Sequence, residues 1–134
     1  MIKIFTDGGS RGNPGNAACA FVVFENEKVV YFDSAYLNQV TNNFAEYAGL
    51  MMALKYLVKA GLNEVSAYLD SELVVKQLNG EYKVKDENIK KHYDQIIELK
   101  KSFKSITFNH VRREENKLAD KLVNIVLDAV EKVS

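Results

Sequence analysis

The stretch IKIFTDGGSRGNPG, residues 2–15, is the part of the chain that most directly predicts its fold. Ile2, Ile4 and Thr6 occupy every second position, which is the period of a β-strand. The strand is predicted to end at Asp7, because the glycines that follow favour a loop and close approach to a ligand. An acid beside such a loop can hold a metal ion near a phosphate. Solvated acids in turns are equally common, so this stretch alone leaves both interpretations open.

The composition predicts one globular domain over residues 1–134. A chain of 134 residues with a 47% apolar share can bury one sizeable core. Lysine plus arginine and aspartate plus glutamate number 18 each, so the net charge is zero. This balance argues against binding of nucleic acid through bulk charge, although local patches stay open. Between Lys76 and Lys104 an excess of lysine predicts either a solvated helix face or a modest phosphate-facing patch.

Cysteine usage and hydropathy predict the compartment. Cys19 is the single cysteine, so no intrachain disulfide can form and a reducing compartment is expected. The first strand begins at Met1, which leaves no room for a signal peptide. No apolar run approaches the ~18 residues that a membrane span needs. We therefore expect a soluble, cytoplasmic protein without a membrane partner.

The remaining pattern predicts a mixed sheet. Residues 17–37 hold two apolar runs separated by residues 25–27, which indicates a hairpin and a three-stranded antiparallel meander. A strand that directly follows a long helix implies a crossover and parallel pairing. The predicted class is α/β, with a mixed five-stranded sheet of three antiparallel strands followed by two parallel ones, flanked by helices. The later elements are a helix ending before Gly61, a strand ending at Asp70, helices over 71–78 and 86–102, a strand over 105–111, and a last helix with a core stripe of Leu118, Leu122, Ile125, Val126 and Ala129.

Four carboxylates are predicted to meet at one edge of this sheet. Asp7 and Asp70 end neighbouring parallel strands, Glu46 lies in the first turns of the connecting helix, and Asp120 opens the last helix. Ligands bind at this edge in open α/β sheets. Clustered carboxylates repel one another unless cations lie among them, and oxygen ligands select Mg²⁺ or Mn²⁺. Two such ions, ~3.5–4 Å apart, promote in-line displacement at phosphorus. The alternative is four unrelated turn and cap acids.

Four segments carry a family resemblance: IFTDGGSRGNPG, TNNFAEYAGLMMAL, LDSELVVKQLNGEYKVK and HVRREENKLADKLVN. Together they resemble ribonuclease H of type 1, in its compact form from bacteria and archaea, from Met1 to about Ala129. The resemblance implies a ribonuclease H-like fold and two Mg²⁺ or Mn²⁺ ions per site. It implies that the catalytic, metal-binding residues are Asp7, Glu46, Asp70 and Asp120.

The resemblance also implies residues that act on the substrate. His110 matches a loop histidine that assists proton transfer or product release. Asn13, Asn42 and Asn43 match polar positions of the family that contact the hybrid, chiefly the 2′-hydroxyls and minor groove of the RNA strand. Arg112 and Arg113 are expected to contact phosphate, with a structural role as the alternative. The predicted substrate-binding residues are Gly8, Asn13, Thr41, Asn42, Asn43, Glu72, Arg112 and Arg113.

Three features depart from the family pattern. Glu72 stands where many bacterial members carry glutamine, an amide that contacts the RNA strand, so the acid is expected to weaken hybrid binding or to recruit water. Arg112 stands where related sequences often have proline, which predicts a more mobile histidine loop. The chain has no tryptophan and residues 80–100 are short, so the long basic handle of some members is absent. No separate hybrid-binding domain is expected.

The resemblance implies an endoribonuclease that cuts the RNA strand of an RNA–DNA hybrid, leaving 5′-phosphate and 3′-hydroxyl ends. We expect a monomer. One alternative is a nuclease of the same fold that acts on double-stranded RNA or on DNA junctions. The other is a non-catalytic module that binds hybrids, against which the presence of all four acids counts.

Overall fold

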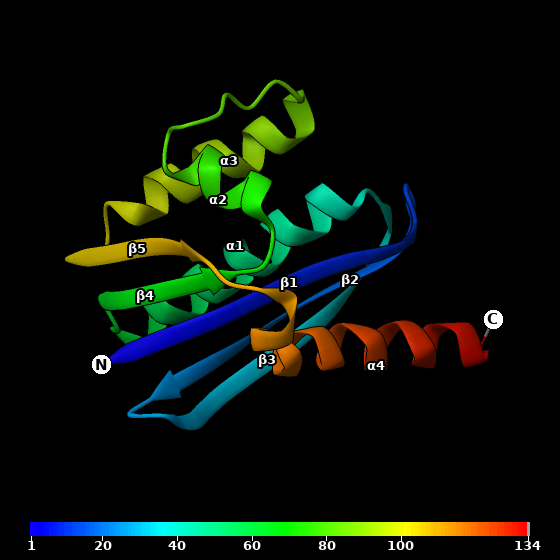
Figure 1. Ribbon diagram of the computed structural model, residues 1–134, viewed down its shortest axis with the longest axis horizontal. Helices are drawn as coiled ribbons and strands as arrows, with labels where there is room; N and C mark the ends of the chain where they lie inside the picture. Colours follow the sequence, from blue (N-terminus) through cyan, green and yellow to red (C-terminus); the bar gives the residue numbers. More distant parts are fainter. Residues whose placement is uncertain (134) are drawn as a thin grey trace.

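The protein contains one five-stranded sheet with the strand order β3-β2-β1-β4-β5 (Figure 1). The computed structural model describes residues 1–133. β1 pairs antiparallel with β2, β2 pairs antiparallel with β3, and β4 pairs parallel with both β1 and β5. This arrangement confirms the predicted α/β class and mixed sheet. The strands are β1 (Ile2–Gly12), β2 (Gly15–Glu25), β3 (Lys28–Val40), β4 (Glu64–Leu69) and β5 (Ser105–His110).

The helices begin and end where local chemistry favours it. Thr41 caps the first helix by accepting a hydrogen bond from the Phe44 N–H (3.1 Å), and Gly61 ends it with φ 74°. At the β2–β3 turn, Asn26 and Glu27 both have positive φ, as a two-residue hairpin turn of type I′ requires. No helix within residues 1–133 is long and apolar enough to span a membrane. The helices are α1 (Asn42–Ala60), α2 (Glu72–Leu78), α3 (Glu87–Lys100), the 3₁₀ helix η1 (Arg113–Glu115) and α4 (Lys117–Val133).

The two faces of the sheet are covered unequally. A large apolar cluster joins β1 and β4 to α1, α2 and α3. On the other face a single helix, α4, lies against β1, β2 and β3 (Figure 1). Its buried cluster is small and consists of Ala18, Ala20, Val123 and Leu127.

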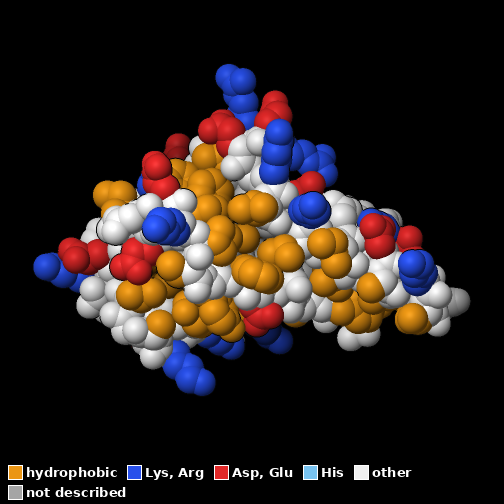
Figure 2. All heavy atoms as spheres, turned by 90° about the horizontal axis from the view of Figure 1, so that it is seen from below, with side chains coloured by type: hydrophobic (Ala, Val, Ile, Leu, Met, Phe, Trp, Pro, Cys, Tyr) orange, Lys and Arg blue, Asp and Glu red, His pale blue; other side chains and the backbone are white. Residues whose placement is uncertain are grey.

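The buried side of α4 matches the predicted stripe only in part, since Leu122 and Val126 are partly buried against this cluster. Leu118 and Ile125 were expected in the core but are 49% and 52% exposed. The helix instead buries Ala119, Val123 and Leu127, which recur every four residues and face the alanines of β2. Small residues on β2 let the helix approach closely. Apolar side chains consequently remain at the surface of this face, as Figure 2 shows from below.

The predicted end of the first strand at Asp7 is wrong. β1 continues through the glycines and pairs with β2 as far as Gly12 opposite Gly15. Gly8 has a packing role, because a Cβ at this position would clash with the backbone of Ala45 in α1. Gly8 therefore permits α1 to lie directly on β1, and the glycines do not interrupt the strand.

Candidate active site

Asp7 and Asp70 lie side by side at one edge of the parallel strands. The β1–β4 ladder ends with Thr6 opposite Leu69, and the next residue along the chain from each is an aspartate. Asp7 is 6% exposed, and Asp70 is half-buried. The predicted juxtaposition of these two acids is present, although β1 itself continues beyond Asp7.

Glu46 reaches the same point from α1. It is 4% exposed, and its Oε1 accepts a hydrogen bond from the Gly8 N–H (2.6 Å). Gly49, one turn later, faces β1, where a Cβ would lie 2.7 Å from the Asp7 carbonyl oxygen. Glycines on both β1 and α1 thus bring the Glu46 carboxyl group next to Asp7.

The three carboxyl groups form a tight cluster. One oxygen from each of Asp7, Glu46 and Asp70 lies within 4.8 Å of the others. Burial raises the pKa of Asp7 to about 7, and the charge of Asp70 adds to this. Burial and the charge of Asp7 raise the pKa of Glu46 well above its usual range. The pKa of Asp70 is also raised, mainly by burial. Burial and mutual repulsion thus both disfavour the charged forms of these three carboxyl groups when no cation lies among them.

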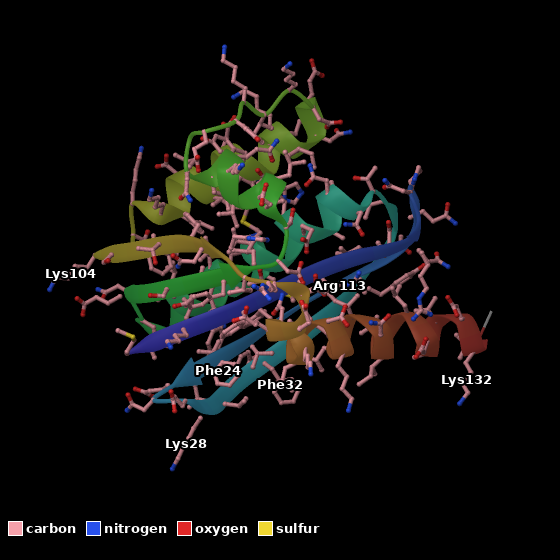
Figure 3. All side chains as sticks on the ribbon, in the orientation of Figure 1. Phe24, Lys28, Phe32, Lys104, Arg113 and Lys132 are labelled. Carbon is pink, nitrogen blue, oxygen red and sulfur yellow. The ribbon has the colours of Figure 1, made fainter. Side chains whose placement is uncertain are left out.

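Asp120 lies at the border of this cluster. It belongs to the first turn of α4 and is 32% exposed. Its charge raises the pKa of both Asp7 and Asp70, yet its carboxylate lies outside the group of three. Its Oδ1 is 3.9 Å from Nη2 of Arg113, a side chain that is 82% exposed (Figure 3). Of the four predicted acids, three meet closely and the fourth faces them from a separate helix.

Asn116 supports the site and was missed by the sequence analysis. It is 1% exposed and directly precedes α4. Its Nδ2 donates to the Thr6 carbonyl oxygen (2.8 Å) and to Asp70 Oδ2 (3.2 Å). The backbone carbonyl oxygen of Asn116 accepts a hydrogen bond from the Asp120 N–H (3.1 Å). The only available signal was an amide four residues before a predicted ligand, which is too common to single out.

The acids lie in a groove of about 470 Å³ between α1 and α4, with β1 as its floor. Two basic side chains line it, Arg11 from β1 and Arg113 from η1. Arg11 was also missed, because an arginine in a predicted glycine-rich loop gives no sign of its partners. The other lining residues are Asp7, Gly8, Gly9, Ser10, Asn42, Glu46, Asp70, Ser71, Asp120, Val123, Asn124 and Leu127.

The donor set fits a hard divalent cation. The close ligands are carboxylate oxygens, and the raised pKa values show a local excess of negative charge that a cation relieves. Oxygen ligands of this kind favour Mg²⁺ and Mn²⁺ over thiolate-binding metals. Cys19, the single thiol, is buried away from the groove lining, and burial raises its pKa to about 12.

Two of the predicted substrate-binding residues, Asn13 and Asn42, join the β1–β2 hairpin to α1. Asn13 Oδ1 accepts from the Asn42 N–H (3.0 Å), and Asn42 Oδ1 accepts from the Ser10 N–H (3.2 Å). Thr41 caps α1, while Asn43 beside it is half-buried. Asn42 is the member of this set that lines the groove. These hydrogen bonds hold the hairpin against the helix at one end of the groove.

The remaining predicted residues lie around the groove. Gly8 is buried beneath α1. Glu72 is exposed and pairs with Lys76 (3.4 Å), outside the groove lining. Arg112 is exposed next to Arg113. His110 is the last residue of β5 and is exposed, and its charge lowers the pKa of Asp70 slightly.

Comparison with known proteins agrees with this geometry. The reverse transcriptase-like family matches residues 5–126. A bifunctional protein of Mycobacterium tuberculosis is 40% identical over 96% of this chain, which spans 36% of that protein. Ribonuclease HI of Halobacterium salinarum is 34% identical over 95% of this chain, which spans 64% of its length. The chain thus covers about one third to two thirds of these relatives.

Solved structures give the same result. The crystal structure of LC11-RNase H1 in complex with an RNA/DNA hybrid superposes with a TM-score of 0.92 at 39% identity, covering 97% of this chain and 99% of that one. The fold and the carboxylate edge together define a ribonuclease H-like protein. More narrowly, the chain belongs to the ribonuclease H type 1 family.

Proposed function

We propose that this protein is an endoribonuclease that hydrolyses the RNA strand of RNA–DNA hybrids, leaving 5′-phosphate and 3′-hydroxyl ends. The observation that carries the proposal is the cluster of Asp7, Glu46 and Asp70, whose oxygens lie within 4.8 Å of one another in a groove. Membership of the ribonuclease H type 1 family supports the substrate class. So does the hybrid bound by LC11-RNase H1.

The proposed cofactor is a pair of Mg²⁺ or Mn²⁺ ions. Asp7, Glu46 and Asp70 would hold them, with Asp120 completing the ligand set from α4. When bound, the ions supply positive charge and Lewis acidity for in-line displacement at phosphorus. The low exposure of Asp7 and Glu46 keeps bulk water from screening these charges.

The other residues bind and orient the substrate. Arg113, on the groove wall, is placed to contact a phosphate, and Arg112 beside it extends the basic surface. Asn13 and Asn42, at the opposite end, would contact 2′-hydroxyls, which distinguish RNA from DNA. His110, exposed at the end of β5, would move a proton at its imidazole or assist product release.

Further parts of the proposal concern Glu72, the oligomeric state and the compartment. Glu72 would contact the RNA strand as a hydrogen-bond acceptor only, in place of an amide that can also donate. The protein would act as a monomer in the cytoplasm. A reducing compartment suits it because its single cysteine, Cys19, is buried and can form no intrachain disulfide.

The test is cleavage of an end-labelled hybrid with Mg²⁺ and, separately, with Mn²⁺. Matching RNA and DNA duplexes serve as competing substrates, and Asp70→Asn serves as the inactive control. Metal-dependent cutting of the hybrid's RNA strand alone is the expected result. Equal cutting of the RNA duplex would instead indicate a nuclease of the same fold with broader specificity. Binding of the hybrid without cleavage under either metal would identify a non-catalytic module.

A further inference from the structure

Helix α4 carries Asp120 but has a smaller apolar contact with the sheet than the helices of the other face. Val123 and Leu127 pack on two alanines of β2, which offer little surface to bury, and Leu122 and Val126 are only partly buried beside them. Leu118 and Ile125 on the same helix are about half exposed. Polar contacts between α4 and the sheet are therefore expected to contribute to the position of Asp120 relative to the other acids.

One such contact involves Arg11, near the end of β1. Its Nη2 lies 3.0 Å from Asn124 Oδ1 and 2.7 Å from Asp128 Oδ1, and its Nη1 lies 2.8 Å from Glu131 Oε1. These partners are spaced by four and three residues, so they share one face of α4. The guanidinium group is planar and charged, which suits several acceptors at once. We call these four residues the Arg11 cluster.

The Arg11 cluster is connected to Asp120. Asn124 accepts from Arg11 through its oxygen and donates through Nδ2 to the Asp120 carbonyl oxygen (3.0 Å). Four residues before Asp120, Asn116 joins the start of α4 to Thr6 of β1. Residues 6 and 11 of β1 thus bracket Asp7, and residues 116 and 124 bracket Asp120. Two polar attachments fix the segment with Asp120 against the strand with Asp7.

We propose that Arg11 is a positioning residue, which sets the place of Asp120 in the metal-binding site through Asn124 and the acids of α4. The proposal rests on the proposed function in so far as Asp120 acts as a metal ligand. Arg11 itself would contact no metal ion. Its two acidic partners, Asp128 and Glu131, are 69% and 52% exposed, so dissolved salt screens their attraction to the guanidinium.

The first test measures amide hydrogen exchange in the metal-free protein. In Arg11→Ala, protection of the amides of Asp120 and Asn124 is expected to fall at least tenfold, while protection in α1 stays unchanged. Lys90→Ala, which removes the exposed ion pair of Lys90 with Asp94 on α3, is the matched control and should leave α4 unchanged. Unchanged protection of α4 in Arg11→Ala would overturn the proposal.

The second test measures Mn²⁺ affinity by calorimetry without nucleic acid. Loss of a group that orients a ligand typically costs about 10-fold or more in metal affinity, so about 10-fold weaker binding is expected for Arg11→Ala at low salt. The difference should shrink at high salt. Arg11→Lys keeps the positive charge but loses the planar, multidentate guanidinium group, so it should recover part of the Mn²⁺ affinity.

A mutant cycle separates this role from direct substrate contact. Asp128→Asn combined with Glu131→Gln should weaken Mn²⁺ binding as Arg11→Ala does, and adding Arg11→Ala should cause little further loss. If Arg11→Ala keeps wild-type Mn²⁺ affinity and loses only hybrid affinity, Arg11 is a phosphate contact and the proposal fails. If the wild type binds no Mn²⁺ but α4 loses protection, the metal assignment fails and the positioning role stands.

Discussion

The two faces of the sheet build one site with unequal support. On the face of α1, α2 and α3, a large apolar core fixes Asp7, Glu46 and Asp70 within 4.8 Å of one another. On the other face, α4 rests on a small cluster rich in alanine and presents Asp120 from outside that group. The four acids look alike in the sequence but are supported differently in the fold. The large core holds Asp7, Glu46 and Asp70, whereas the position of Asp120 depends on how α4 is attached to the sheet.

The largest expected loss of activity follows from changing one of the three clustered acids, Asp7, Glu46 and Asp70. Asp70→Asn should reduce cleavage of the hybrid at least about 1,000-fold, equivalent to about 4 kcal/mol, because it removes a carboxylate from the tight cluster. The measurement is single-turnover cleavage with saturating Mg²⁺. The circular dichroism spectrum should remain that of the wild type, which excludes misfolding as the cause. Retention of more than a tenth of the activity would contradict the assignment of the cluster.

The second prediction concerns the pH dependence of stability without metal. The pKa of Asp7 in the folded state is about 7, against an ordinary value of 3.8, so the folded protein retains a proton that the unfolded chain releases between these values. The contribution of Asp7 to the free energy of unfolding should therefore be most favourable below about pH 4 and should fall as the pH rises to about 7. The loss is at most about 4 kcal/mol.

Denaturant unfolding in a chelator, from pH 4 to 8, measures this loss. Asp7→Asn should flatten the profile and be more stable than the wild type at pH 8, because it removes a buried charge. Added Mg²⁺ should restore much of the wild-type stability at pH 8 by binding the folded state. A wild-type profile that rises with pH in the chelator would contradict the repulsion inferred from the cluster.

The sequence predicted the two faces of the sheet with unequal success. The period-two pattern of β1, the crossover and the strand ending at Asp70 predicted the sheet order, because these signals are local. The glycines after Asp7 led to a wrong strand end, since Gly8 is there to admit α1 against β1, a long-range contact that the local sequence does not reveal. The buried side of α4 was predicted only in part, because Leu122 and Val126 pack against the cluster whereas Leu118, Ile125 and Ala129 are exposed. The helix sequence has several apolar stripes, and packing against the alanines of β2 determines which one is buried.

The supporting residues could not be predicted for a related reason. Asn116 and Arg11 act through partners far along the chain, such as Thr6 and Asp128. Neither lies in a pattern that distinguishes a hydrogen-bonding residue from a solvated one. Residues that carry chemistry recur in recognisable segments, whereas residues that position them are found only when the segments are brought together.

The third prediction compares one leucine from each face. Leu54 in α1 and Leu127 in α4 are 0% and 2% exposed, so burial alone predicts equal effects of truncation. Leu54→Ala should nevertheless cost about 4 kcal/mol, because its surroundings cannot collapse into the cavity. Leu127→Ala should cost about 2 kcal/mol, because the small cluster under α4 can relax. Urea unfolding measures both, and equal losses would contradict the unequal support of the two faces.

The last prediction concerns the fourth acid itself. Asp120→Asn should reduce hybrid cleavage about 10-fold, clearly less than Asp70→Asn, because Asp120 lies outside the tight group and is 32% exposed. An asparagine oxygen can still coordinate a cation, and water can reach the position to replace the lost charge. The loss should appear mainly as a higher Mg²⁺ requirement, so raising Mg²⁺ should recover activity in Asp120→Asn and not in Asp70→Asn. Equal, unrecoverable losses in the two variants would show that α4 holds Asp120 as firmly as the core holds Asp70, and the distinction between the two faces would not extend to chemistry.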